Sequence, residues 1–294
     1  MKIYTPHYYS QFHCIADKCR HSCCIGWEID IDEKTLAVYQ NTPGPFGDRL
    51  KANISQGKDA HFILGNQERC PFLNEQNLCD IYTELGEENL CGICTDHPRF
   101  RNFFDNRTEI GLGMCCEAAA ELILRFEDKV QITCTETGEK EPFFPERKRA
   151  LTILQNREIP VDNRIEILKE EFGIFLPEKS FSQWLEVYLS LEILDKKWEQ
   201  LLKNAPEAAP EFKEETWQIA IEQLLVYFVF RYMHKGIENG SIPAYLAFCI
   251  LSTEMIRRLC KTETDIFEVA RMYSQEIEYC EENVEELMFE IEIG

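Results

Sequence analysis

The first half of the chain holds cysteines in four groups whose spacing suits metal binding. A thiolate is a soft ligand for zinc and iron–sulfur centres, and each such centre takes four ligands. Short groups separated by longer loops can supply them, and close spacing avoids ordering a long loop. We therefore predict metal binding by nine candidate ligands: Cys14, Cys19, Cys23, Cys24, Cys70, Cys79, Cys91, Cys94 and Cys116.

The spacing leaves the identity of the metal open. Zinc knuckles favour paired CxxC units, and here only Cys91 and Cys94 have that form. The adjacent pair Cys23-Cys24 is unusual for a single zinc, whereas a larger iron–sulfur cluster tolerates irregular spacing better. His13, His21 and His97 lie near the cysteines, but a histidine beside a metal ligand is more often a surface residue or a neighbour of the ligand.

Composition bounds the class of protein and its partners. The sequence has 294 residues and 14 cysteines, and its first residues lack the apolar core of a signal peptide. We expect a cytoplasmic protein, in which so many cysteines are more often ligands than disulfides. The longest apolar run, 224–230, is too short to span a membrane. A net charge of −21 disfavours binding to nucleic acid or to anionic lipid.

The elements that must position these cysteines fall into two regions. Residues 1–140 form a cysteine-rich metal-binding region of irregular structure, and residues 141–294 form an all-helical region. We expect a mainly α fold in which the first region packs on the second. The change from clustered cysteines to helical periodicity marks the boundary.

Helical periodicity is clear in the second region. Trp217 to Met233 is apolar on most faces, as a buried central helix is, and Gly236 and Gly240 mark its end. Segments 242–259 and 266–287 predict two more helices. A further stripe, with Ser180 and Ser182 as possible N-caps, consists of Phe181, Trp184, Leu185, Tyr188, Leu191 and Trp198. We interpret the isolated Cys249, Cys260 and Cys280 as small buried hydrophobic residues.

Several motifs together resemble the flagellin lysine-N-methylases. They run over essentially the whole chain, and the cysteine groups are also similar to a broader class of CxxCxxCC proteins described as zinc- or iron-chelating. The motifs are Cys23-Cys24-Ile25-Gly26-Trp27-Glu28-Ile29-Asp30, Cys70-Pro71-Phe72-Leu73-Asn74, Leu78-Cys79-Asp80-Ile81-Tyr82, Cys91-x2-Cys94-x3-Pro98-Arg99-Phe100, Glu109-Ile110-Gly111-Leu112 and Ala270-Arg271-Met272-Tyr273-Ser274-Gln275-Glu276-Ile277-Glu278.

The resemblance implies an enzyme that transfers methyl groups from S-adenosylmethionine to lysines of flagellin. It also implies a 4Fe-4S cluster, which moves the choice of metal from zinc towards iron–sulfur. The alternative is a non-enzymatic zinc- or iron-binding scaffold or carrier. Flagellin is the partner that the resemblance predicts.

The residues support methyl transfer only by exclusion of one cofactor site. A Rossmann methyltransferase shows a glycine-rich turn between a strand and a helix, and this sequence has no GxGxxG segment. The radical signature CxxxCxxC is not met either, so polar and radical transfer both stay open. Amine methylation needs a neutral lysine and hence a nearby base. Asp96, Glu87 and Glu88 are candidates for that base, although a solvated loop position is the commoner role; the catalytic residues stay unassigned.

Overall fold

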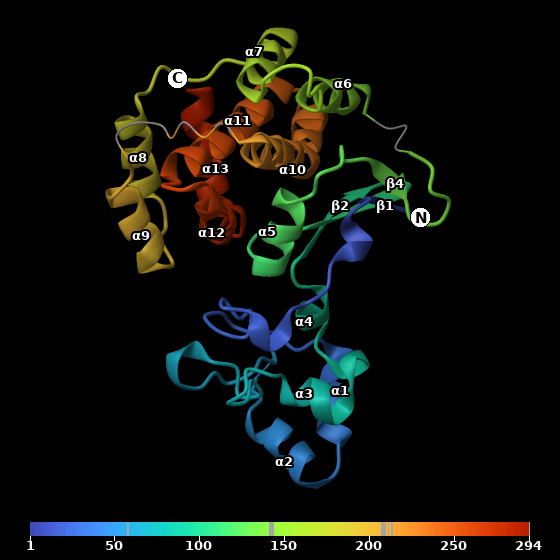
Figure 1. Cartoon of the computed structure of the whole chain (residues 1–294). Helices are drawn as coiled ribbons and strands as arrows, with labels where there is room; N and C mark the ends of the chain where they lie inside the picture. The colour runs from blue at the N-terminus through green and yellow to red at the C-terminus, as the bar shows by residue number, and fades with distance from the viewer. Residues whose placement is uncertain (58, 141–143, 207–209, 211, 213, 294) are drawn as a thin grey trace. The chain divides into compact units, whose positions relative to one another are not determined.

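The structure is a computed structural model that describes residues 1–57, 59–140, 144–206, 210, 212 and 214–293. It contains two compact units: the cysteine unit, residues 13–99, and the helical unit, residues 1–12 with 100–294 (Figure 1). The expected mainly α class is confirmed. The boundary that the sequence predicted, between residues 140 and 141, does not coincide with the boundaries of these units. The division into domains 1–140 and 141–294 stays a prediction.

The cysteine unit consists of short helices joined by long irregular segments. Its α-helices are α1 (Glu33–Asn41), α2 (Gly44–Ala52), α3 (Asp80–Leu85) and α4 (Gly92–Asp96). A small aromatic core holds them together, in which the ring of Phe62 lies 6.0 Å from that of Tyr39 and 5.0 Å from that of Phe72. Cys70 and Cys91 belong to this core. The thiols are therefore part of the packing of the unit.

The helical unit carries a small sheet that the sequence did not predict. The strands lie in the order β2-β3-β1-β4, with β1 parallel to β3 and antiparallel to β4. Lys2 pairs with Arg107, and Tyr4 pairs with both Glu109 and Cys134. The bounds are β1 (Lys2–Pro6), β2 (Arg99–Phe104), β3 (Arg107–Leu112) and β4 (Ile132–Cys134).

The other described elements of the helical unit are helices, and those after residue 140 follow one another without a strand. Figure 1 shows α10 and α11 side by side, and both are largely buried. The bounds are α5 (Glu117–Leu124), α6 (Pro145–Leu154), α7 (Val161–Phe172), α8 (Phe181–Ser190), α9 (Lys196–Lys203), α10 (Glu215–Asn239), α11 (Ile242–Leu259), α12 (Ile266–Tyr273) and α13 (Glu281–Glu292).

Most predicted helices occur, with two differences. Segment 266–287 is not one helix, because a π-helical turn at Ser274–Glu278 and a break at Cys280 separate α12 from α13. Gly236 does not follow α10 but lies inside it, where a Cβ would come 3.0 Å from the Cα of Ile242. Gly236 thus permits the close approach of α10 and α11, and Gly240 ends the helix in the left-handed conformation.

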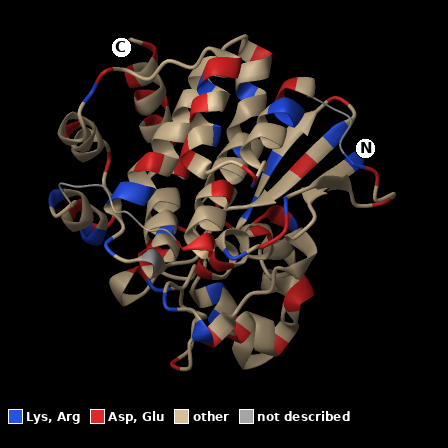
Figure 2. Ribbon diagram, turned by 45° about the horizontal axis from the view of Figure 1, so that its top comes forward, with Lys and Arg blue, Asp and Glu red and all other residues tan. Residues whose placement is uncertain are grey.

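The remaining helical details follow from capping and burial. Ser180 caps α8 in a capping box with Gln183, as its position predicted, and Trp198 falls in the separate helix α9. Cys249, Cys260 and Cys280 are buried, as we expected of small apolar residues. Acidic and basic residues are interspersed along the ribbon in Figure 2. In the part of the chain that the structure describes, no helix is long and apolar enough to cross a membrane.

Candidate functional site

Five of the predicted ligands meet in the cysteine unit, and we call them the thiol cluster: Cys24, Cys70, Cys79, Cys91 and Cys94. Electrostatic interactions link Cys70 with Cys24, Cys79 and Cys91, and link Cys94 with Cys91, Cys24 and Cys70. These residues come from four separate segments between positions 24 and 94. The fold therefore gathers thiols that are far apart in sequence.

The segment from Cys70 to Cys79 forms a tight knuckle. The amide of Leu73 donates to the carbonyl of Cys70 at 3.1 Å, and Leu73 forms a β-bridge with Cys79. Asn74 closes the turn because its side-chain oxygen accepts from the amides of Gln76 and Leu78, each at 3.0 Å. Side-chain hydrogen bonds of this kind fix the loop without regular secondary structure.

Two arginines fasten the knuckle to its surroundings. Arg69 donates to the carbonyls of Leu73 at 3.2 Å and Asn74 at 2.6 Å. Arg49 of α2 donates to the carbonyl of Pro71 at 2.6 Å and to Asp80 at 2.7 Å. The backbone beside Cys70 and the start of α3 beside Cys79 are thereby held to one another.

Cys24 is joined to the same knuckle through the backbone. The amide of Cys70 donates to the carbonyl of Cys24 at 2.8 Å. A hydrogen bond with Cys23 lowers the pKa of the Cys24 thiol to about 7, and Ser22 and Arg69 act in the same direction against burial. The pKa of the Cys70 thiol moves the other way, to about 12, mainly because the thiol is buried and also because Cys24, Cys79 and Cys91 lie nearby.

Cys91 and Cys94 flank the first turn of α4 and hydrogen-bond to each other. That bond is the largest cause of a lowered pKa at Cys91 and of a raised pKa at Cys94. Asp32, the N-cap of α1, accepts from the amide of Gly92 at 2.9 Å and so holds the backbone beside Cys91. The hydroxyl of Tyr39 lies 3.5 Å from the sulfur of Cys91. The sequence prediction missed Asp32 and Tyr39.

The other four predicted ligands are placed differently. Cys14 and Cys23 are exposed and Cys19 is half-buried, all three in the cysteine unit. Cys23 lies beside the thiol cluster through its bond to Cys24. Cys116 belongs to the helical unit, where it is the N-cap of α5. The ligand role of all nine stays a prediction.

Donor chemistry fits a thiolate-bound metal centre, although the side chains are not arranged as one. Among the described residues, no group of three or more His, Cys, Asp or Glu side chains is positioned to hold a metal ion. The five thiols of the cluster nevertheless exceed the four that a zinc or a 4Fe-4S centre takes. The fit therefore rests on the chemistry and the convergence of the donors.

The candidate bases and histidines near the cluster differ in exposure. Glu87, Glu88 and His13 are exposed, while Asp96 and His21 are half-buried. Burial, together with the charge of Arg99, lowers the pKa of His97, so its imidazole is neutral near pH 7. A neutral imidazole can accept a proton or bind a metal.

Two curated proteins with similar sequences are named for the same activity. A lysine-N-methylase of Salmonella typhimurium is 27% identical over 165 residues, which are 51% of this chain and 40% of that protein. A lysine-N-methylase of Salmonella choleraesuis is 26% identical over a segment of the same length. The chain is thus similar to two lysine-N-methylases over about half of its length. The resemblance that the motifs predicted is thereby confirmed.

A third relative adds a flagellar connection. The flagellar biosynthetic protein FliU of Salmonella muenchen is 27% identical over 155 residues, which are 48% of this chain and 85% of that protein. The segment that matches the two lysine-N-methylases spans about 40% of their length. No protein-family model matches the chain. No solved structure matches it either.

Proposed function

We propose that this protein is an S-adenosylmethionine-dependent methyltransferase that acts on lysines of flagellin and depends on a cysteine-ligated 4Fe-4S cluster. The similarity to the lysine-N-methylases carries the proposal for the reaction. The name of the flagellar relative supports flagellin as the substrate. Zinc is the alternative metal.

The thiol cluster supplies the ligands in this proposal. Cys70 and Cys91 are buried in the small core of the cysteine unit, and Cys24, Cys79 and Cys94 interact with them. Cys24, whose thiol pKa is lowered to about 7, would be one of three ligands of a 4Fe-4S centre with one open iron. Two of Cys70, Cys79, Cys91 and Cys94 would complete the set, and the other thiols would remain as neighbours of the centre. When bound, iron with an open coordination position supplies a site for the amino and carboxyl groups of S-adenosylmethionine.

The protein must also provide a neutral lysine. The net reaction forms a bond between lysine nitrogen and the methyl carbon, breaks the sulfur–methyl bond and releases one proton. A carboxylate or imidazole that takes this proton raises the fraction of nucleophilic amine. Asp96, Glu87, Glu88 and the neutral His97 have this capacity, and they lie within a few residues of Cys91 and Cys94 in the sequence.

The experiment compares wild type with the double variant Cys23→Ala/Cys24→Ala. Each protein, purified without oxygen, is incubated with flagellin and S-adenosylmethionine, and lysine masses are read by mass spectrometry. We expect wild type to be brown and to add methyl groups, while the variant is colourless and inactive. Cys280→Ala is the matched control, because Cys280 is buried in the helical unit and is not a predicted ligand.

Two results would contradict the proposal in different ways. A colourless double variant that still methylates flagellin separates the reaction from the cluster. A wild type that holds iron but methylates nothing favours a metal-binding carrier. Metal and sulfide analysis of the same samples distinguishes iron–sulfur from zinc.

A further inference from the structure

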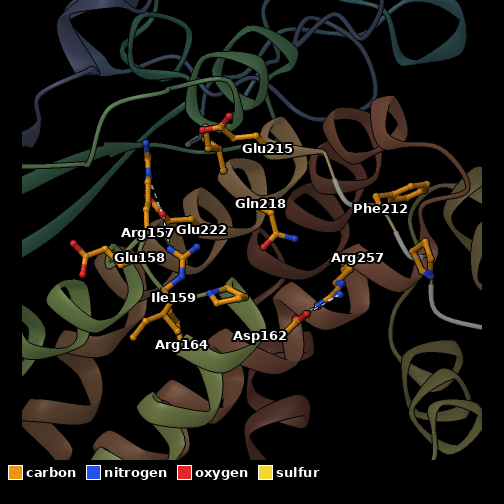
Figure 3. Close-up of a pocket in the computed structure, with 13 residues that line it drawn as sticks. Arg157, Glu158, Ile159, Asp162, Arg164, Phe212, Glu215, Gln218, Glu222 and Arg257 are labelled. Atoms are coloured by element: carbon orange, nitrogen blue, oxygen red, sulfur yellow. Dashed lines mark hydrogen bonds and ion pairs between the residues drawn. The ribbon is translucent and has the colours of Figure 1, made fainter.

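The charged side chains around a cavity of about 1010 Å³ in the helical unit mostly pair with one another. Glu222, fully buried in α10, accepts from Nε of Arg157 at 3.1 Å and from Nη1 of Arg164 at 2.6 Å (Figure 3). Arg257 of α11 donates to Asp162 of α7. These pairs hold α7, α10 and α11 together and leave little charge for a ligand. A buried polar group that faces a predicted ligand lies instead in the cysteine unit.

Tyr39 of α1 places its phenolic hydroxyl beside the thiol of Cys91. The Tyr39 side chain is fully buried, and its ring stacks on that of Phe62 with the centroids 6.0 Å apart. Its oxygen lies 3.5 Å from the sulfur of Cys91, and its hydroxyl donates to the carbonyl of Asn89 at 2.8 Å. Because the packed ring fixes the oxygen, only the hydroxyl proton can change direction, by rotation about the C–O bond.

The backbone around Cys91 is fixed as well. Asp32, the N-cap of α1, accepts from the amide of Gly92 at 2.9 Å. The carbonyl of Cys91 accepts from the amides of Cys94 and Thr95, each at 3.0 Å. Helix α1 therefore holds both the hydroxyl and the backbone beside the sulfur in one frame.

The direction of the hydrogen bond between Tyr39 and Cys91 depends on the proton of the thiol. A thiol can donate to the tyrosine oxygen while the tyrosine donates to Asn89, as the two distances allow. Metal binding releases the thiol proton to solvent, and the thiolate that remains can only accept. A neutral donor beside a buried thiolate stabilises its charge, because water does not reach it.

We propose that Tyr39 is a positioning residue of the metal centre, whose hydroxyl donates to the sulfur of Cys91 when Cys91 binds the metal as a thiolate. The proposal rests on the cysteine-ligated centre of the proposed function, and it selects Cys91 among the four thiols that would accompany Cys24. Hydrogen bonds to the ligands of a metal centre tune its affinity and its reduction potential. Asp32 acts in the opposite sense, because an electrostatic interaction links its negative charge with Cys91.

The test compares Tyr39→Phe with Asp32→Asn in the full chain, purified without oxygen. A redox titration followed by electron paramagnetic resonance gives the midpoint potential of the iron–sulfur centre. Reduction adds negative charge to the centre, and a donor to its sulfur stabilises that charge. We therefore expect Tyr39→Phe to disfavour the reduced centre by about tenfold, which is a midpoint about 59 mV lower for one electron. Asp32→Asn removes a negative charge and should raise the midpoint.

A loss of packing alone would not move the two variants in opposite directions. Ile29→Val is the matched control, because Ile29 is buried in the same core and carries no group that can donate. We expect it to change the ratio of reduced to oxidised centre by less than about twofold. Should the Asp32 variant not fold, the contrast between Tyr39→Phe and Ile29→Val decides the proposal.

The same variants decide the proposal if metal analysis finds zinc in place of iron. Zinc affinity, measured by competition with a chelator, then replaces the midpoint potential. We expect Tyr39→Phe to bind zinc about tenfold more weakly than wild type, and Ile29→Val to remain within about threefold.

The outcomes separate this proposal from the proposed function, because none of the measurements uses flagellin. A midpoint or zinc affinity that Tyr39→Phe leaves at the wild-type value overturns the role of Tyr39, even in a protein that methylates flagellin. Midpoint shifts of the same sign in Tyr39→Phe and Asp32→Asn, or a wild type that holds neither metal, overturn it too. The expected shifts in a protein that methylates nothing support Tyr39 and contradict the proposed reaction.

Discussion

The hydroxyl of Tyr39 lies 3.5 Å from the sulfur of Cys91 and donates to the carbonyl of Asn89 at 2.8 Å. Tyr39 is fully buried, and its ring lies near that of Phe62 in the core of the cysteine unit. The contact joins α1 to the segment that precedes α4. It couples the packing of the unit to the position of a predicted ligand.

Removal of this hydroxyl should weaken the cysteine unit without changing its shape. We expect Tyr39→Phe to lower the free energy of unfolding by about 1–2 kcal/mol, because the Asn89 carbonyl loses its buried donor. Urea unfolding of wild type and variant measures the difference. Tyr82→Phe, at an exposed position of α3, serves as the control and should change stability by less than about 0.5 kcal/mol. Equal effects of the two substitutions would contradict this reading of Tyr39.

The cysteine groups were predictable from sequence, but the residues that position them were not. Spacing alone marked Cys70, Cys79, Cys91 and Cys94 as predicted ligands, because cysteines that share a site often cluster along the chain. Asp32 contacts Gly92 from 60 residues away, and no local pattern encodes that distance. The turn at Asn74 could have been predicted, because Asn is a common turn residue and Asn74 lies in the short loop between Cys70 and Cys79.

Glu222 is the carboxylate on which two arginines depend, and its loss should be costly. We expect Glu222→Gln to reduce the free energy of unfolding by about 3 kcal/mol or more, because Arg164 stays buried without a counter-charge. Glu215→Gln, an exposed residue of the same helix, should change it by less than about 0.5 kcal/mol. Thermal and urea unfolding of the two variants check the contrast. Similar stabilities would show that the arginines find other partners.

The helices were more predictable than the sheet for a related reason. The run that contains Glu222 is apolar on most faces, so the sequence marks α10 as buried, and a carboxylate within it signals a buried ion pair. The sheet joins Lys2 to Arg107 across a separation that periodicity does not detect. The strands are short, and β3 carries the buried charges Arg107 and Glu109, which obscure an alternating pattern.

Gly111 is required by a close approach within the sheet of the helical unit. A Cβ at this position would come 2.6 Å from Cε1 of Phe100, whose ring packs against Tyr227 and beneath the guanidinium of Arg231. We expect Gly111→Ala to destabilise the protein by about 1–3 kcal/mol, because Phe100 has to leave these contacts. Gly57→Ala, where a Cβ meets nothing within 4 Å, is the control. Unchanged unfolding of the Gly111 variant would show that the ring moves freely.

His234 should make the stability of the helical unit depend on pH. Burial in α10 lowers its pKa from 6.5 to about 4; nearby Glu109 opposes this shift, and Arg147 and Lys235 add to it. Its ring packs edge-on against Phe104 at 5.6 Å. Between these two pKa values the unfolded chain binds a proton that the folded chain does not, so stability falls as the pH falls.

The expected loss is about 2 kcal/mol between pH 7.5 and pH 5, and the measurement is urea unfolding across that range. His234→Gln has no ring to protonate, so this part of the pH dependence should disappear in the variant, even if its stability at pH 7.5 is lower. His13→Gln, at an exposed position, should keep the wild-type dependence. A His234 variant with the full wild-type slope would assign the pH dependence to groups other than His234.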